Sequence, residues 1–395
     1  MLILFVHNYY QQRGGEDIGV GQERDLLAAR GHRILEYCRD NTEIRSNGLA
    51  ANVRLGIGTI WSQRSYNEIR ALVHRERPEV AFFHNVVPLI SPSAYYACHR
   101  AGIPVVQTLH NYRLFCPAGQ FYREGRICEE CVQQSVLRSV QHRCYHGSAA
   151  ATASVAGMLA VHRWMKTSVR LVDRFIVRTE FARRWFVGAG LCAEKVTVKP
   201  CFVEPDPGLR SGLREGALFV GRLSAEKGLP TLLGAWRRLG SKIPLKIVGD
   251  GPLRQPLEKE IGGRWGIELL GWLEASSVYE EMKQARFLVF PSEWYEGLPL
   301  TIVQAFACGL PVVASRLGSM SEIVDHGKTG LHFKAGDEKE LAAAVDWAWT
   351  HPAELEEMGR NARAEYKAKY TAQQNYDALM RISEEVIRGK RQASA

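Results

Sequence analysis

Short, mostly apolar runs alternate with longer amphipathic segments along most of the chain. In the first half the runs are LILFVH, VAFFH, PVVQTLH, RFIVRT and KVTV, and helix-like segments ending at Arg30 and Arg100 follow the first two. In the second half they are ALFVGR, PLKIVGDG, IELLGW and FLVF, with KGLPTLLGAWRRL and SSVYEEMKQA as helix-like segments between them. Runs that are apolar on both faces are typical of parallel strands buried in a sheet. The alternation therefore predicts doubly wound parallel sheets covered by helices.

The two sets of runs are separated by CFVEPDPGLRSGLRE, a segment rich in Pro, Gly and charge that covers residues 201–215. A chain of 395 residues is also too long for a single ordinary α/β core. We therefore predict an N-terminal domain over 1–200, a linker over 201–215 and a C-terminal domain over 216–372. Helical segments close the chain from Glu338 onwards, and residues 373–395 form a last, separate helix.

The charge of the chain is concentrated in its first half. Residues 1–200 carry 26 Lys and Arg against 16 Asp and Glu, whereas the remaining residues carry 25 against 26. A basic half indicates an anionic partner, and because no nucleic-acid-binding motif accompanies the charge we expect no nucleic acid. An anionic membrane surface or a lipid acceptor linked through pyrophosphate fits better. A solvated basic face is the alternative.

The stretch 158–174 is the candidate membrane contact, because it mixes apolar residues with cations in the manner of an interfacial helix. The apolar residues are Trp164, Met165 and Val169, and the cations are Arg163, Lys166 and Arg170. Packing of this helix on its own domain is the alternative.

The opening segment MLILFVHNYY has no basic stretch before its short apolar run. It predicts a first strand, not a signal peptide or a membrane span. Residues 149–160 are apolar, but they are small and few, so they predict a core or interfacial helix. We expect a cytoplasmic protein that associates peripherally with the inner face of the membrane.

The segment FPSEWYEGLPLTIVQAFACGLPVVAS, residues 290–315, predicts a strand, a tight acidic loop, a helix over 301–308 and a second strand. Its loop stands at the carboxyl end of a strand, where open α/β sheets bind ligands. The helix start offers N–H groups to a phosphate, and the Glu296 carboxylate accepts hydrogen bonds from sugar hydroxyls. The loop therefore predicts a nucleotide-sugar site. An ordinary strand–helix crossover with an exposed acidic loop is the alternative.

Two further strand ends carry residues suited to phosphate. The run from Gly221 to Gly228 holds Arg222 and Lys227, a planar fork and a compact point charge. The turn after the next strand holds Gly249 and Gly251, which permit close backbone approach. In the first half, Gly14 and Gly15 follow the first strand and open a helix, and His110 ends the strand PVVQTL.

The segment 290–315 resembles the signature of the retaining glycosyltransferases of family 4, which have the GT-B fold. In that family an E-x7-E pair follows a P-S dipeptide and leads into an E-A-x-A-x-G-x-P-V-V-A-S run. Here Glu296 is the first Glu, whereas Gln304 takes the place of the second. The resemblance implies an α/β, GT-B architecture of two Rossmann-like doubly wound parallel-sheet domains that face a cleft. It also implies that the helix over 373–395 crosses back to the first domain.

The resemblance also implies roles for the predicted site residues. Arg222 and Lys227 would hold the donor diphosphate and neutralise the leaving group, which makes catalysis independent of a metal. Glu296 would bind hydroxyls of the donor sugar, and His110 would lie close to the transferred sugar. Further donor-binding residues would be Gly14, Gly15, Gly221, Gly249, Gly251, Trp272, Gly297, Leu298 and Gln304. For Trp272 the alternative to stacking on the base is packing at a domain interface, and Gln304 would bind the ribose more weakly than a carboxylate.

Together these features predict a retaining glycosyltransferase. It would move a sugar from a nucleoside-diphosphate-sugar to a lipid-linked saccharide or a growing polysaccharide. No protein nucleophile is implied, because in the family the β-phosphate of the donor takes the acceptor proton. Two alternatives stay open. One is a nucleotide-sugar epimerase on the same fold, and the other is a non-catalytic nucleotide-sugar-binding or scaffold subunit, given Gln304.

An insert over 115–146 after the strand that ends in His110 concentrates four of the nine cysteines. They are Cys116, Cys128, Cys131 and Cys144, with His142 and His146 nearby. A C-x2-C pair with two outliers predicts a structural zinc site made of four thiolates. Reduced cysteines that pack in the loop are the alternative, and disulfides are disfavoured in a reducing cytosol.

Overall fold

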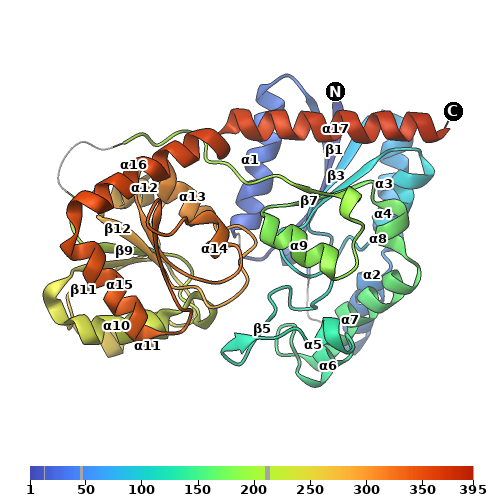
Figure 1. Cartoon of the computed structure of the whole chain (residues 1–395). Helices are drawn as coiled ribbons and strands as arrows, with labels where there is room; N and C mark the ends of the chain where they lie inside the picture. The colour runs from blue at the N-terminus through green and yellow to red at the C-terminus, as the bar shows by residue number, and fades with distance from the viewer. Residues whose placement is uncertain (13, 45–47, 210–213, 395) are drawn as a thin grey trace. The chain divides into compact units, whose positions relative to one another are not determined.

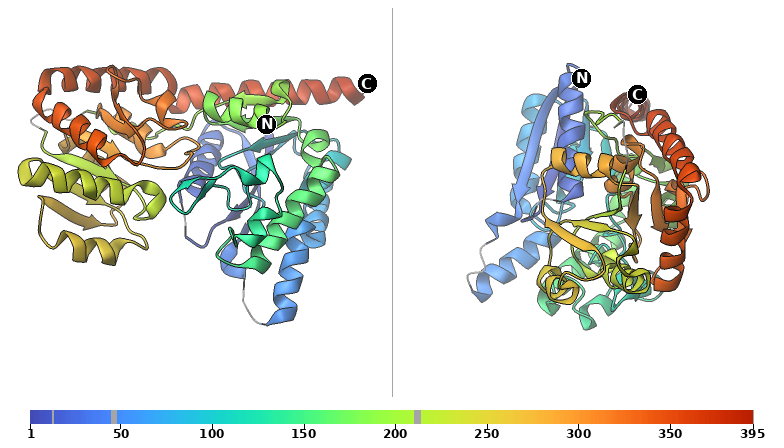
Figure 2. Two further views of the ribbon diagram at one scale, coloured as in Figure 1. Left: turned by 60° about the horizontal axis from the view of Figure 1, so that its bottom comes forward. Right: turned by 90° about the vertical axis from the view of Figure 1, so that its left-hand side faces the viewer.

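The computed structural model describes residues 1–12, 14–44, 48–209 and 214–394, which fall into two compact units (Figures 1 and 2). The first unit comprises Met1–Phe121, Cys128–Lys199 and Asn375–Ala395, and the second comprises Tyr122–Ile127 and Pro200–Gln374. The division after Lys199 and before Asn375 lies close to the ends of the domains expected from the sequence. Of the expected linker, residues 210–213 lie outside the described residues.

Each unit is built around a sheet of six parallel strands, which confirms the predicted doubly wound α/β architecture. In the first sheet the spatial order is β2-β1-β3-β4-β7-β8. The strands are β1 (Leu2–Tyr9), β2 (Arg33–Asp40), β3 (Val80–Phe83), β4 (Val105–Thr108), β7 (Arg174–Val177) and β8 (Val196–Val198). The order reverses between β1 and β3, so the loops after these two strands diverge and leave room for a ligand.

In the second sheet the spatial order is β11-β10-β9-β12-β13-β14, and it reverses between β9 and β12. The strands are β9 (Ala217–Val220), β10 (Leu245–Val248), β11 (Ile267–Gly271), β12 (Phe287–Phe290), β13 (Val312–Ser315) and β14 (Gly330–Phe333). Numbered within the sheet this is the order 3-2-1-4-5-6 of dinucleotide-binding folds. A separate two-stranded hairpin is formed by β5 (Tyr122–Arg123) and β6 (Arg126–Ile127).

Helices cover both faces of the first sheet. Val20 of α1 and Leu379 and Ile382 of α17 pack with Phe5 and Phe82 on one face, whereas the ring of Phe83 meets Tyr95 of α4 on the other. Figure 1 shows α17 lying beside β1 and α1. The helices are α1 (Gly15–Ala29), α2 (Leu49–Ile60), α3 (Gln63–Glu76), α4 (Ser93–Arg100), α5 (Glu130–Gln133), α6 (Arg138–Gln141), α7 (Ala149–Trp164), α8 (Thr167–Leu171), α9 (Glu180–Gly188) and α17 (Ala372–Ser394).

The second sheet is covered in the same way, because successive residues of a strand face opposite sides. Phe219 packs in one apolar cluster with α10 and α15, and its neighbour Leu218 packs in the other with α12 and α13. The helices are α10 (Leu229–Leu239), α11 (Arg254–Ile261), α12 (Ala275–Gln284), α13 (Leu300–Ala307), α14 (Met320–Ile323), α15 (Glu338–Thr350) and α16 (Pro352–Lys369).

The prediction of a single interfacial helix over 158–174 is wrong. The helix α7 ends at Trp164, and Lys166 adopts a left-handed conformation, with φ of 53°, before α8 begins. The break is held by His162, whose ring bonds the Thr167 hydroxyl at 2.9 Å and the Ile60 carbonyl at 2.8 Å. A polar side chain that ties the helix end to two other segments thus outweighs the helical periodicity.

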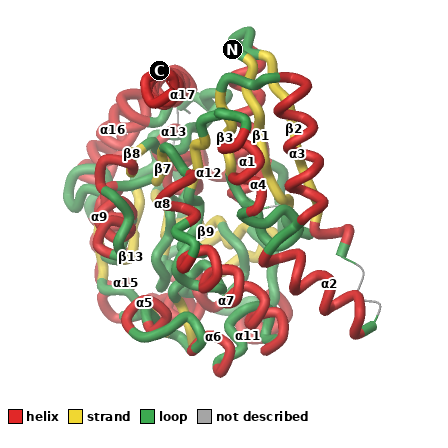
Figure 3. The backbone as a smooth tube through the Cα atoms, turned by 90° about the vertical axis from the view of Figure 1, so that its right-hand side faces the viewer, coloured by secondary structure: helices red, strands yellow, loops and turns green. Residues whose placement is uncertain are grey.

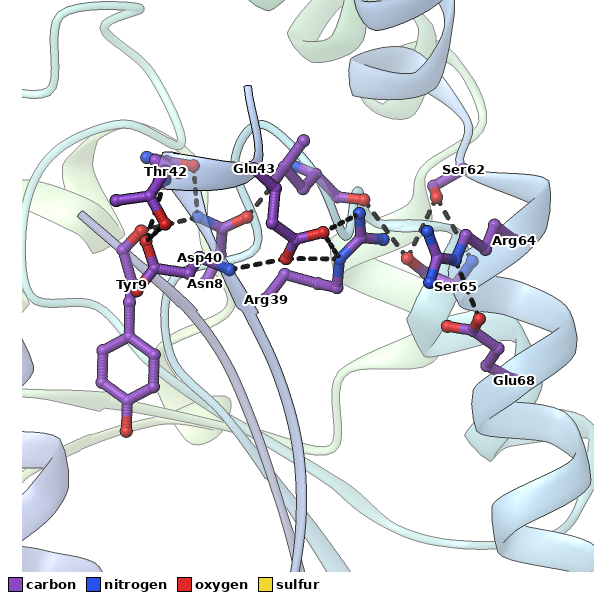
Figure 4. A network of polar contacts seen from close by, with 12 residues as sticks. Asn8, Tyr9, Arg39, Asp40, Thr42, Glu43, Ser62, Arg64, Ser65 and Glu68 are labelled. Atoms are coloured by element: carbon purple, nitrogen blue, oxygen red, sulfur yellow. Dashed lines mark hydrogen bonds and ion pairs between the residues drawn. The ribbon is translucent and has the colours of Figure 1, made fainter. Parts of the chain in front are cut away.

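A polar network fastens the carboxyl ends of β1 and β2 (Figure 4). Asp40 accepts hydrogen bonds from the backbone N–H and the hydroxyl of Thr42, and Glu43 receives the Arg39 guanidinium in a two-pronged contact. The Asn8 amide donates to Asn41 across the two strand ends at 2.7 Å. These bonds fix the edge of the sheet from which the loop before α1 departs.

One buried carboxylate holds three distant segments of the first unit together. Glu23 of α1 accepts hydrogen bonds from Lys199 Nζ at 2.6 Å and from Arg178 Nη1 at 2.8 Å, and Lys199 also donates to Asn375 at 3.1 Å. Burial by itself raises the pKa of the Glu23 carboxyl, but the two cations beside it hold the pKa below its usual range. Glu23 is therefore charged in the folded unit.

We predict that Glu23→Ala lowers the stability of the first unit by roughly 3–5 kcal/mol, because it leaves buried cations without their counter-charge. The measurement is urea denaturation followed by circular dichroism. In the native chain this stabilisation is present above the ordinary glutamate pKa of about 4.3 and is lost as the pH falls toward the lower folded value. Glu68→Ala removes an exposed partner of Arg64 and serves as the control, with a cost under about 1 kcal/mol. Equal losses for the two variants would contradict the assigned role of Glu23.

Candidate functional site

Lys227 and Glu296 meet at the carboxyl ends of β9 and β12 in the second unit. Lys227 Nζ lies 2.6 Å from Glu296 Oε1. The two strands are hydrogen-bonded neighbours at the point where the order of the sheet reverses. A cation and a carboxylate thus share the position at which such sheets bind their ligands.

The Glu296 carboxylate is buried and tightly held. Its Oε1 atom accepts hydrogen bonds from Lys227, from the Ser292 hydroxyl at 2.7 Å and from the Trp294 indole N–H at 2.8 Å. The ammonium of Lys227 in turn lies over the rings of Trp294 and Phe290, 5.3 and 5.7 Å from their centroids. Three donors and two aromatic faces fix both charged groups in place, which is the preorganisation that binding of a polar ligand requires.

The loop that carries Glu296 is locked at its backbone as well. The Ser319 hydroxyl contacts the carbonyl oxygens of Glu296 and Gly297 at 2.8 and 2.9 Å. The next helix, α13, begins at Leu300, directly after Leu298 and Pro299. The Ile302 N–H bonds the Pro299 carbonyl at 3.0 Å, and the N–H groups before it are those that a helix start can offer to a phosphate.

Glycines at two further strand ends serve close backbone packing. A Cβ atom at Gly249 would lie 1.9 Å from the Gly221 carbonyl oxygen, and one at Gly251 would lie 2.5 Å from the Leu223 carbonyl oxygen. Any side chain at either position would force the loops after β9 and β10 apart. The geometry therefore explains these residues sterically, and their contact with a donor stays a prediction.

The remaining residues predicted for the donor lie at different depths in the second unit. Arg222 is exposed, and the Trp272 side chain is 69% exposed. Gln304 is half-buried on α13, and its amide donates to the Tyr279 hydroxyl at 3.3 Å. The NH₂ group of the Gln304 side chain thus already makes a hydrogen bond within the second unit.

In the first unit the glycine loop after β1 stands over a buried histidine. His7 donates from Nε2 to Asp17 at 2.8 Å and accepts at Nδ1 from the Asn85 backbone N–H at 3.3 Å. Asp17 also accepts from the Gly14 N–H. Among the described residues, a Cβ atom at Gly14 or Gly15 would meet nothing within 4 Å, their chain neighbours aside.

His110 is joined to a second histidine that the sequence did not single out. His84 Nδ1 and His110 Nε2 lie 2.9 Å apart at the ends of β3 and β4. Burial lowers the pKa of His84 to about 3 and holds that of His110 well below its ordinary value. Both rings are therefore neutral near pH 7 and offer hydrogen bonds without charge.

A second polar group lies beside this pair. Glu16 accepts hydrogen bonds from the Tyr10 hydroxyl at 3.1 Å and from the Asn111 amide at 3.0 Å. Arg113 donates to the Tyr10 hydroxyl at 3.2 Å and to Asn85 at 3.4 Å. Burial raises the pKa of Glu16 above that of an exposed carboxyl, so this carboxyl holds a proton more readily than one in water.

Sequence reasoning missed His7, His84 and Asn85 in the first unit and Ser292 and Trp294 in the second. The signal was present, because each follows or ends a predicted strand, as His110 and Glu296 do. Arg113 had no such signal. It stands in the irregular segment after β4, and only the folded chain brings it to Tyr10.

The four cysteines of the insert lie near one another in the first unit. The pKa of the Cys131 thiol is raised to about 12. Burial is the larger cause, and the neighbouring thiols of Cys116, Cys144 and Cys128 add to it. Among the described residues, no three or more His, Cys, Asp or Glu side chains are arranged to hold a metal ion. Cys116, Cys128 and Cys131 are free thiols. Four thiols are donors that suit zinc, and zinc binding stays a prediction.

Two family models together match most of the chain. Residues 20–207 match the model described as glycosyltransferase family 4, and residues 211–365 match that described as glycosyl transferases group 1. The chain belongs to the family 4 glycosyltransferases. The predicted resemblance is thereby confirmed, and it covers both units.

Known members of the family are similar to this chain mainly over part of its length. It is 33% identical over 159 residues to the D-rhamnosyltransferase WbpZ of Pseudomonas aeruginosa, covering 39% of this chain and 41% of that protein. It is 26% identical over 279 residues to the amylovoran biosynthesis glycosyltransferase AmsK of Erwinia amylovora, covering 66% of this chain and 67% of that protein. The match therefore spans less than half of WbpZ and about two thirds of AmsK.

Solved structures extend the likeness of the fold to the whole chain. HepE of Anabaena, determined in complex with UDP-glucose, superposes with a TM-score of 0.67 at 16% identity and covers 97% of this chain and 100% of that one. Sucrose-phosphate synthase of Thermosynechococcus elongatus gives a TM-score of 0.71 at 17% identity, with 98% and 99% covered. The family 4 glycosyltransferase has the GT-B fold, as predicted.

We predict that Arg222→Ala and Lys227→Ala each lower kcat by about 10²–10³, because a charge that develops on the leaving diphosphate loses its partner. Steady-state kinetics at saturating donor measure the effect. Lys242→Ala is the control, since Lys242 is an exposed cation of the same unit and pairs with Asp346. Addition of a chelator should leave catalysis unchanged. Near-native turnover in both variants would show that the diphosphate binds elsewhere.

For Gln304 we predict that substitution by Glu preserves or strengthens donor binding and that substitution by Ala weakens it. A carboxylate would accept hydrogen bonds from both ribose hydroxyls with charge-assisted strength. Calorimetric titration with the donor measures the effect. Tyr279→Phe separates the two contacts of the amide, because it removes only the hydroxyl that Gln304 bonds. Unchanged donor affinity in both Gln304 variants would mean that α13 does not reach the ribose.

For the cysteines we predict about one zinc per purified chain by elemental analysis. The double substitution Cys128→Ser with Cys131→Ser should remove the metal and loosen the insert, because structural zinc contributes folding free energy directly. Cys38→Ser with Cys192→Ser, two cysteines outside the insert, should leave the zinc content unchanged. A metal-free native chain of full stability would favour reduced, packed cysteines.

Proposed function

We propose that this chain is a retaining glycosyltransferase that moves a sugar from a nucleoside-diphosphate-sugar to a lipid-linked saccharide or growing polysaccharide. The observation that carries the proposal is the contact between Lys227 and Glu296 at the switch point of the second sheet. A diphosphate needs a cation and a sugar needs a hydrogen-bond acceptor, and a nucleotide-sugar presents the two groups side by side. The pair supplies both requirements 2.6 Å apart.

The mechanism follows from what each side chain can do. Lys227 and Arg222 stabilise the negative charge that grows on the leaving nucleoside diphosphate, and this makes a metal unnecessary for catalysis. Glu296 orients the donor sugar through its hydroxyls. As the glycosidic bond to phosphate breaks, the β-phosphate oxygen takes the proton of the acceptor hydroxyl, which attacks from the same face. The remaining work of the enzyme is positioning.

Neutral His110 suits a role on the acceptor side. A neutral imidazole donates or accepts one hydrogen bond to a sugar hydroxyl without drawing the proton away. Its hydrogen bond to His84 fixes the orientation of the ring. The pH dependence of turnover in the range from 6 to 8 therefore reflects other groups than these two histidines.

The similar proteins support the choice of substrates. HepE was solved with UDP-glucose, and AmsK is an amylovoran biosynthesis glycosyltransferase. These facts favour a nucleotide-sugar donor and a polysaccharide-type product for the present chain. The base, the sugar and the linkage require measurement.

The decisive experiment incubates the purified chain with a panel of nucleotide-sugars, selected by thermal shift because a bound donor stabilises the fold. A transferase releases nucleoside diphosphate and passes the sugar to an acceptor with the anomeric configuration retained. A nucleotide-sugar epimerase isomerises the donor, and a scaffold subunit binds it without turnover. Product of inverted configuration would refute the retaining mechanism.

A face of the first unit suits the membrane that a lipid-linked acceptor requires. Exposed apolar residues on α2, α7 and α8 are accompanied by the cations of the same helices. We call this set the basic apolar face, and its residues are Val53, Arg54, Ile57, Val161, Arg163, Trp164, Lys166, Val169 and Arg170. Residues 44–67 and 131–172 contain no Asp or Glu. An anionic lipid surface is the partner that matches apolar residues among uncompensated cations.

The helices of this face pack closely together. A Cβ atom at Gly56 would lie 2.7 Å from Ser154 Oγ, and one at Gly157 would lie 3.3 Å from Ile60 Cδ1, so glycines let α2 and α7 run side by side. Figure 3 shows α2 standing out from the first sheet. Within the described residues no helix has the length and apolarity to cross a bilayer. The association that we propose is peripheral, at the cytoplasmic leaflet, as expected for exposed apolar residues among cations.

We predict that the chain sediments with liposomes in proportion to their anionic lipid fraction and that added salt reverses the binding. Each basic residue near such a surface contributes on the order of 1 kcal/mol. Trp164→Ser with Lys166→Ser should weaken the binding. Lys242→Ser with Arg264→Ser, in the second unit, is the matched control. Equal recovery in the supernatant with neutral and anionic vesicles at low salt would indicate a soluble acceptor.

A further inference from the structure

The first unit contains a cavity of about 300 Å³ at the carboxyl ends of β3 and β4. Its walls come from the loop after β3, from the segment that follows β4 and from α7 and α8. The volume falls at the lower end of the range of ligand pockets, about 300–1,000 Å³. All of the lining residues belong to the first unit.

One end of the cavity is polar and incompletely bonded. His84 Nε2, Thr108 Oγ1 and Arg113 Nε are buried, and none of them has a hydrogen-bond partner among the described residues. His84 and Thr108 are 3% and 1% exposed. A buried polar atom without a partner costs free energy that the native state rarely accepts, so these three atoms offer hydrogen bonds to a polar group that enters the cavity. His110 and Glu16 line the same end.

The body of the cavity is apolar. Its walls include Leu114 and Phe115 from the segment after β4, and Met158 and Leu159 from α7. Glu16 is the only carboxylate among the described lining residues. A soluble oligosaccharide would need hydrogen-bond partners along its whole length, and this wall offers few. An aliphatic chain needs none.

The opposite end lies at the corner between α7 and α8. Arg163 and Lys166 line it, together with Val169, whose side chain is 50% exposed. The Arg163 guanidinium stands over the Phe115 ring at 5.5 Å. These three residues also belong to the basic apolar face, so the cavity connects the polar end at His84 with the surface proposed to meet lipid.

We propose that this cavity binds the acceptor through an apolar aglycone. The hydroxyl-bearing sugar lies at His84, Thr108 and Arg113, and the hydrocarbon attached to it runs along Leu114 and Leu159 to the corner at Lys166. The inference rests on the proposed transferase function and narrows its acceptor to an amphiphilic glycoside. It also assigns the hydrocarbon a binding site in the protein, in addition to the bilayer.

The test is calorimetric titration of the full chain with octyl β-glucoside below its micelle concentration and with methyl β-glucoside. The octyl glycoside should bind at least tenfold more tightly than the methyl glycoside. Leu159→Trp fills the cavity and should weaken octyl glucoside binding at least tenfold. Ala160→Trp is the matched control, because Ala160 is the neighbouring residue on α7, is exposed and does not line the cavity. Circular dichroism verifies that both variants fold.

If Leu159→Trp does not fold, Leu114→Trp makes the same test from the segment after β4. Equal binding of the two glycosides, or octyl glucoside binding that survives both substitutions, would overturn the proposal. Transfer assays with the same two acceptors separate it from the proposed function. Transfer to both with the same KM would leave the transferase standing and refute the aglycone site. Octyl glucoside binding that depends on Leu159, without turnover of any donor, would support the cavity and refute the transferase.

Discussion

Within each of the two six-stranded sheets all strands run parallel, and this constraint places the candidate chemistry. In a parallel sheet all the loops that follow a strand gather at one edge, so residues far apart in sequence become neighbours. Lys227 and Glu296 meet in this way although 69 residues separate them. His84 and His110 do the same across the ends of β3 and β4. The strand order adds a second feature, because the loops part where it reverses and leave room for a ligand.

The contact between Lys227 and Glu296 holds both side chains in place, but a ligand that binds either of them has to compete with the other. Without a ligand, the ammonium and the carboxylate satisfy each other, and Ser292 and Trp294 complete the carboxylate's hydrogen bonds. A diphosphate that approached Lys227 would have to share it with Glu296, and a sugar hydroxyl would have to take a place beside that oxygen. These bonds hold the pair in place, and a ligand that presents both an anion and a hydroxyl fits it better than one that presents only an anion.

The sequence was sufficient for the fold class, because strands buried on both faces produce short apolar runs. It singled out Glu296, Lys227 and His110 because they follow such runs. It could not reveal partners that other elements bring. Neither the contact of Lys227 with Glu296 nor that of Arg113 with Tyr10 follows from local spacing. The break at Lys166 was missed because His162 bonds Ile60, a residue of another helix. Periodicity describes one element at a time and contains no information on such tertiary bonds.

The bond from Lys199 to Asn375 has a consequence for how this chain is assembled. Lys199 is the last residue of the first unit before the chain leaves it, and Asn375 is the first after it returns, and their side chains share a hydrogen bond of 3.1 Å. The stretch 200–374, which makes up most of the second unit, is therefore inserted into the first unit between two residues that are hydrogen-bonded to each other. A short linker between Lys199 and Asn375 would therefore be enough to join the two parts of the first unit without the inserted domain. Recombination could exchange the inserted domain while the core of the first unit, fastened at Glu23, remained as it is.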